Sequence, residues 1–157
     1  MTAAFRFRAL ASEPFADLLA YDDRQLREIG ARRMTADEHP GFPCRISLSD
    51  ATVGETVLLL PYVHHDVDSP YRASGPIFVR EHARQAQPEP GEIPVFLLHR
   101  LLSVRAYDAN AMMIDAECVQ GGELASLMPR LFATPAVRYL HVHNARPGCF
   151  NCAVERL

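Results

Sequence analysis

The chain has 157 residues, which suits one domain with a single hydrophobic core. Apolar residues make up 48% and charged residues 22%, as in soluble globular proteins. All 16 basic residues are arginine, which excludes lysine chemistry such as Schiff-base formation, and the net charge of −3 argues against nucleic-acid binding.

Two segments of the sequence predict whether the protein enters a membrane and in which compartment it is found. The longest apolar run, 57–60, is far shorter than the roughly 20 residues of a membrane-spanning helix, so no membrane partner is expected. The first segment, 1–8, carries arginines where a secretory signal needs an apolar stretch. We therefore expect a cytoplasmic protein whose four cysteines are reduced thiols.

The hydrophobic pattern predicts strands in long consecutive runs. In chain order, the expected strands are 5–10, 45–48, 56–63, 77–80, 96–107, 111–119, 139–144 and 150–154. The segment 56–63 is apolar almost throughout, which is typical of a central strand. Short helices are expected between Ser12 and Gly30 and over 123–132. Three segments that contain prolines are expected to be loops: 31–43, 64–76 and 85–94.

This order of elements predicts the fold class. Strands that follow one another, rather than alternating with helices, pair mostly antiparallel. We therefore expect an α+β fold as a single domain over 1–157. Its sheet would be mostly antiparallel and could close into a barrel-like form, with two or three short helices.

Three stretches carry a resemblance to a known family. They read PCRISL at 43–48, SPYRASGPIFV at 69–79 and LHVHNARPGCF at 140–150. In this order they resemble the bacterial family catalogued as domain of unknown function 1203, and the resemblance extends from about Phe5 to Arg156. Because that family name implies no activity, the expected function rests on the residues themselves.

The segment that ends the chain holds the residues best suited to chemistry. His141 and His143 are two apart, so on a strand both imidazoles point to one face. Cys149 and Cys152 form a Cys-x-x-Cys pair, and with the two histidines they make a zinc-binding set. On a regular strand, however, the two cysteines point to opposite faces. We therefore expect no cofactor, with zinc on these four residues as the alternative.

The pairing of the last two strands decides which residues share a face. In one register Asn144 pairs with Cys149, and the two histidines then share a face with Phe150 and Cys152.

In the other register Ala145 pairs with Cys149 across a three-residue loop. The two histidines then share a face with Cys149 and Asn151, which puts a thiol beside two imidazoles. Gly148 could supply the positive φ that such a loop requires, and this favours the second register.

The loop over 69–76 has a path defined by its prolines and suits ligand binding. Arg72 could hold a carboxylate or phosphate, and Tyr71 could supply an orienting hydroxyl. Asn144 or Asn151 on the last hairpin would orient the same ligand.

These residues predict a pocket for a small anionic molecule where this loop meets the last hairpin. If the protein is an enzyme, Cys149 is the expected nucleophile, with His143 or His141 as the general base. Two other classes remain open: a zinc-binding module, and a non-catalytic structural or interaction protein. Strand edges could support a homodimer, although nothing in the sequence requires one.

Overall fold

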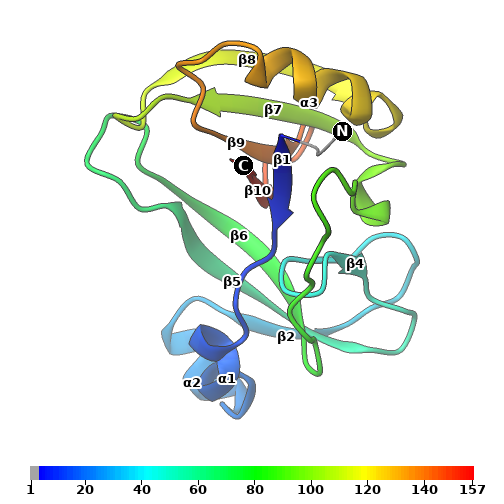
Figure 1. The fold of residues 1–157 in the computed structure, drawn as a ribbon. Coiled ribbons are helices and arrows are strands. Elements are labelled where there is room, and N and C mark those ends of the chain that lie inside the picture. The colour runs from blue at the N-terminus through cyan, green and yellow to red at the C-terminus, as the bar shows by residue number, and fades with distance from the viewer. Residues whose placement is uncertain (1–3) are drawn as a thin grey trace.

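The computed structural model describes residues 4–157 and contains two five-stranded sheets (Figure 1). Sheet A contains β1 (Phe5–Arg8), β7 (Leu101–Tyr107), β8 (Met113–Gln120), β9 (Tyr139–Asn144) and β10 (Phe150–Arg156), in the order β1-β10-β9-β7-β8. Sheet B contains β2 (Arg32–Thr35), β3 (Pro43–Cys44), β4 (Ser49–Asp50), β5 (Thr56–His65) and β6 (Ala73–Arg80), in the order β2-β5-β6-β3-β4. Residues 1–3, which begin the segment considered for a secretory signal, lie outside the described residues.

Strand pairing confirms the predicted α+β fold. Neighbouring strands pair antiparallel except β3 and β6, which are parallel where Cys44 meets Phe78. The strands form two open sheets, so the barrel-like form is not adopted. As predicted, β5 lies inside its sheet, between β2 and β6.

The helices are short. They are α1 (Ala16–Leu19), α2 (Asp23–Glu28) and α3 (Leu124–Phe132), with 3-10 turns η1 (Glu13–Phe15), η2 (Val95–Leu97) and η3 (Gly121–Glu123). A capping box between Asp22 and Gln25 begins α2. Within residues 4–157, no helix has the length and apolar character needed to cross a membrane.

One core lies between sheet A and α3, which covers one face of that sheet (Figure 1). Leu124, Leu127 and Leu131 recur at helical spacing and are buried. They belong to the same cluster as Leu140 and Val142 of β9. Because neighbouring residues of a strand point to opposite faces, the histidines of β9 lie on the face away from α3. A second core joins sheet B to η1 and α2.

Two predicted strand segments are wrong. Residues 45–48 form the turn between β3 and β4, where Leu48 adopts a φ of 50°. Ile46 and Leu48 are buried because the turn itself packs inside the molecule, which imitates the pattern of a strand. The expected strand over 96–107 begins only at Leu101, after η2 and a turn.

Two predicted loops also differ. The loop over 31–43 contains β2, which the pattern misses because this edge strand is mostly exposed and carries no apolar alternation. The loop over 64–76 is shorter than predicted, since β5 continues through His65 and β6 begins at Ala73. This extension carries His64 and His65 up to sheet A, where they contact β9.

Two hydrogen bonds of loop residues help to join the two sheets. The loop between β5 and β6 reaches the turn between β7 and β8 (Figure 1), where the Ser69 hydroxyl donates to the Ala111 carbonyl at 2.9 Å. On the other side, Nε of Arg45 donates to the Phe150 carbonyl at 2.7 Å. The arginine of the β3–β4 turn is therefore part of the junction between the sheets.

Candidate functional site

A cavity of about 610 Å³ lies where the two sheets meet. This volume is within the range of pockets that hold small molecules. The residues on its walls that could carry chemistry are Arg45, His99, Arg100, Asn144, Arg146 and Cys149. No aspartate or glutamate of residues 4–157 lines it. The cavity is therefore rich in cations and hydrogen-bond donors.

Arg45 is the most buried of the cavity arginines, with 1% of its surface exposed. Its Nε donates to the Phe150 carbonyl, and its Nη1 donates to the Pro43 carbonyl. Burial lowers its pKa to about 10, an effect that the nearby Cys149 sulfur partly opposes. No carboxylate of residues 4–157 forms an ion pair with it. The guanidinium remains charged at neutral pH without a counter-ion.

Arg100, in contrast, has a counter-ion. Its Nη2 lies 2.5 Å from Oδ1 of Asp50, and its Nη1 donates to Oδ2 of the same carboxylate at 3.0 Å. Nε2 of His99 lies 3.6 Å from Asp50 Oδ2. Burial, and then the charge of Arg100, lowers the pKa of His99. This imidazole is consequently neutral at pH 7.

Asn144 ends β9 at the wall of the cavity, and Asn151 orients its amide. Nδ2 of Asn151 donates to Oδ1 of Asn144 at 2.9 Å. Because its oxygen is engaged in this way, Asn144 has its Nδ2 donor available to a ligand. Asn151 is fully buried, and its Oδ1 has no partner among residues 4–157.

The hairpin between β9 and β10 adopts the first of the two registers, and the favoured one is wrong. The N–H of Asn144 donates to the Cys149 carbonyl at 2.9 Å, and Phe150 pairs with His143. Gly148 does have a positive φ, 85°. Its carbonyl accepts a hydrogen bond from Nδ1 of His143 at 2.9 Å. This bond fixes the loop over 145–148, and Cys149 does not share a face with the histidines.

A bulge at Asn151 places Cys152 opposite Val142 and not opposite a histidine. The pairing shifts between Phe150 and Cys152, so Phe150 lies with the histidines while Cys152 packs in the core beneath α3. Burial raises the pKa of the Cys152 thiol. Cys152 is therefore an unreactive core residue, whereas Cys149 is partly exposed in the cavity.

The four residues of the zinc alternative do not converge. Cys149 lines the cavity and Cys152 faces α3, while His141 and His143 lie on the opposite face of β9. In the part of the chain that the structure describes, no three histidine, cysteine or acidic side chains are grouped as metal ligands. The Cys-x-x-Cys pair and the two histidines are therefore on different faces of the hairpin.

His141 and His143 instead meet His64 and His65 at the end of β5. The ring centroids of His64 and His143 are 5.0 Å apart, and those of His65 and His141 are 4.9 Å apart. We call these four side chains the imidazole cluster. None of them lines the cavity, and no hydrogen bond within residues 4–157 joins Cys149 to the two histidines of β9.

Hydrogen bonds fix the ring of His65 in this cluster. Its Nδ1 donates to the Tyr71 carbonyl at 2.7 Å, and its Nε2 accepts from the Tyr139 hydroxyl at 2.6 Å. The Nδ1 atoms of His64 and His141 are buried without a partner among the described residues.

Burial keeps three of these imidazoles uncharged at neutral pH. It lowers the pKa of His141 to about 3 and that of His64 and His143 to about 4. Neighbouring imidazoles and the Arg105 guanidinium lower these pKa values further. His64, His141 and His143 are therefore neutral at pH 7 where the two sheets meet.

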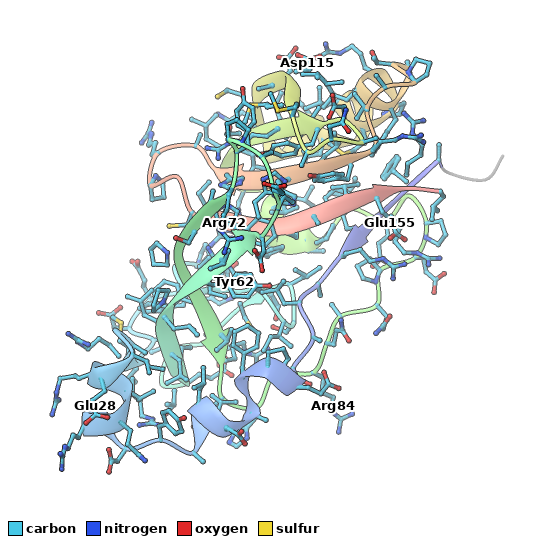
Figure 2. The ribbon with its side chains drawn as sticks, turned by 90° about the vertical axis from the view of Figure 1, so that its left-hand side faces the viewer. Glu28, Tyr62, Arg72, Arg84, Asp115 and Glu155 are labelled. Carbon is cyan, nitrogen blue, oxygen red and sulfur yellow. The ribbon has the colours of Figure 1, made fainter. Side chains whose placement is uncertain are left out.

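Tyr71 and Arg72 lie away from the cavity. Arg72, labelled in Figure 2, forms an ion pair with Asp66, and the two side chains are 56% and 70% exposed. The ring of Tyr71 lies 6.2 Å from that of Tyr107, and neither residue lines the cavity. Arg72, the predicted ligand-binding arginine, is exposed, whereas Arg45 of the cavity is buried.

Comparison with known proteins gives a family and no activity. The model of a family described as "Protein of unknown function (DUF1203)" matches residues 41–156, more than half of the chain. The chain belongs to the DUF1203 family. The match contains all three stretches that carried the resemblance, although it begins at residue 41 and not near Phe5. No curated protein and no solved structure matches the chain.

All residues that line the cavity fall within the part of the chain that matches the DUF1203 model. Sequence reasoning found two of them, Cys149 and Asn144, and missed the three arginines. Arg45 stands in one of the three stretches that carried the resemblance, but its neighbours predict a strand. The one available signal is a charged residue within the apolar segment 44–48.

Proposed function

We propose that this DUF1203 protein binds a small organic anion, a carboxylate, in the cavity between its sheets. Arg45 would be the inner anchor of the ligand, and Nδ2 of Asn144 would donate a second hydrogen bond. Paired donors of this kind suit the two oxygens of a carboxylate.

The observation that carries this proposal is the burial of Arg45 without a carboxylate partner. An unpaired buried charge costs several kcal/mol in a folded protein. Two backbone carbonyls engage Nε and Nη1, while Nη2 makes no hydrogen bond within residues 4–157. Because the side chain also lines the cavity, a bound anion would supply the missing acceptor and the missing charge.

Alkylation of Cys149 with a charged and a neutral reagent tests this proposal. Bromoacetate carries a carboxylate, and bromoacetamide is its neutral analogue; each transfers its carbon to a thiol while bromide leaves and the thiol proton passes to water. Cys118 is exposed and serves as an internal reference. We expect the preference for bromoacetate to be about tenfold larger at Cys149 than at Cys118, as a charge-assisted contact would give. Peptide mass spectrometry reads both sites in one sample, and equal preferences would contradict the proposal.

Asn144→Asp provides the matched variant. The substitution retains an oxygen to accept from Asn151 but places a carboxylate in the cavity, so the preference of Cys149 for bromoacetate should disappear. Asn110→Asp makes the same charge change at an exposed turn and should leave the preference intact. If the preference for bromoacetate survives in Asn144→Asp, it arises from the general electrostatic field of the protein surface and not from the cavity.

A thiol-dependent reaction on the bound anion is the second candidate function. It is favoured by Cys149, which lines the same cavity as Arg45 and His99. With this function, His99 and not a histidine of β9 would be the neutral base nearest the ligand. Alkylation of Cys149 by bromoacetate would then saturate with reagent concentration, and His99→Gln would slow the maximal rate. A rate that rises linearly with reagent concentration would remove this candidate.

A further inference from the structure

The cavity contains two cations that no acidic side chain balances. Of its three arginines, Arg100 is neutralised by Asp50. Arg45 and Arg146 form no ion pair with any residue of 4–157. The ligand that complements this site should therefore carry two negative charges.

These two cations lie at different depths. Arg45 is buried at the junction of the sheets, whereas Arg146 is exposed on the loop between β9 and β10. The walls also include the apolar side chains of Leu59, Phe78 and Leu101. A cavity with one buried cation, one exposed cation and apolar walls complements a molecule that has two anionic groups joined by carbon.

We infer that the ligand is a dicarboxylate whose inner carboxylate binds Arg45 and Asn144 and whose outer carboxylate binds Arg146. The inference rests on the proposed anion site and narrows its ligand. A phosphate group concentrates its charges at one point, whereas Arg45 is buried and Arg146 is exposed.

Calorimetric titration with succinate, butyrate and inorganic phosphate tests this inference. Butyrate has the same number of carbons as succinate and lacks the second carboxylate. We expect succinate to bind about fivefold more tightly than butyrate, since one partly exposed ion pair distinguishes the two. Phosphate should bind more weakly than succinate.

Arg146→Gln should lower the affinity for succinate to that for butyrate and leave the butyrate affinity unchanged. Arg138→Gln, at another exposed arginine, should leave both affinities unchanged. Because Arg146 is exposed on a loop, its replacement is not expected to disturb the fold.

Each outcome has a distinct meaning. Equal binding of succinate and butyrate would overturn the dicarboxylate inference and leave the anion site standing. Phosphate binding tighter than succinate would also overturn it, in favour of a ligand with one compact dianionic group. If none of the three anions binds, both the inference and the proposed function fail.

Discussion

Acidification from about pH 6.5 to about pH 5 is expected to lower the free energy of unfolding steeply. The slope should be about 1.4 kcal/mol per pH unit for each proton that unfolding takes up. Three histidines of the imidazole cluster each take up one such proton when the protein unfolds: His64, His141 and His143. This pH range lies above the region where ordinary carboxylates titrate, so the histidines determine the slope.

The sign follows from the pKa values in the two states. In the folded protein the pKa is about 3 for His141 and about 4 for His64 and His143. In the unfolded chain each returns to about 6.5. The unfolded chain therefore binds these protons at higher pH, and acid favours unfolding. The stability is complete above about pH 6.5 and is lost as the pH falls toward 4.

The surroundings of the cluster explain why it does not accept protons while folded. The Arg105 guanidinium lies 3.5 Å from Nε2 of His143, and the other close neighbours of the four rings are Tyr107, Tyr139 and Phe150. A protonated imidazole there would lie beside the Arg105 guanidinium, and none of these close neighbours is an anion. Protonation is thus coupled to separation of β5 from β9.

Denaturant unfolding at a series of pH values measures this slope. His141→Leu removes one titrating group and an Nδ1 atom that lacks a partner, so it should reduce the slope by one proton. Val142→Ala, a truncation of its buried neighbour, should lower stability by about 1–2 kcal/mol at every pH and leave the slope unchanged. A stability that is flat between about pH 6.5 and 5 would show that the cluster is not buried as a neutral unit.

Replacement of Gly121 by alanine is expected to prevent folding or to cost more than about 4 kcal/mol. A Cβ at this position would lie 1.8 Å from the Leu97 carbonyl oxygen and 2.6 Å from its carbon. Both contacts are with backbone, so no side-chain rotation can relieve them. The N–H of Gly121 also donates to the Arg100 carbonyl at 2.8 Å, which holds η3 against the turn that precedes β7. The close approach therefore fixes Arg100 at the wall of the cavity.

Gly122 provides the matched control. No atom lies within 4 Å of a Cβ built there, and its φ does not require glycine. Gly122→Ala should therefore change the melting temperature by only a few degrees. If Gly121→Ala were as stable as Gly122→Ala, the packing of η3 against Leu97 would be contradicted.

The elements predicted correctly carry a clear apolar pattern of their own. The strand over 56–63 is apolar almost throughout, the helix over 123–132 presents apolar side chains at helical spacing, and both are found. The polar edge strand β2 and the buried turn at 45–48 depend on what packs against them. A local pattern cannot contain that information.

Some residues of the candidate site could also be predicted from the sequence, and others depend on packing. Cys149 was predicted as a thiol beside two imidazoles and Asn144 as an amide that orients the ligand, and both line the cavity. The expected grouping of Cys149 with His141 and His143 depended on a hairpin register that a bulge and one histidine hydrogen bond decide. Arg45 lies more than 90 residues before this hairpin, and only the packing of the two sheets brings it there.

A crystal structure of the protein with butyrate would show whether Arg45 and Asn144 bind a carboxylate. We expect a carboxylate in the cavity within hydrogen-bond distance of Arg45 Nη2 and Asn144 Nδ2, with the carbon chain against the apolar wall. A cavity that holds only water at saturating butyrate, or a carboxylate bound elsewhere on the protein, would contradict it.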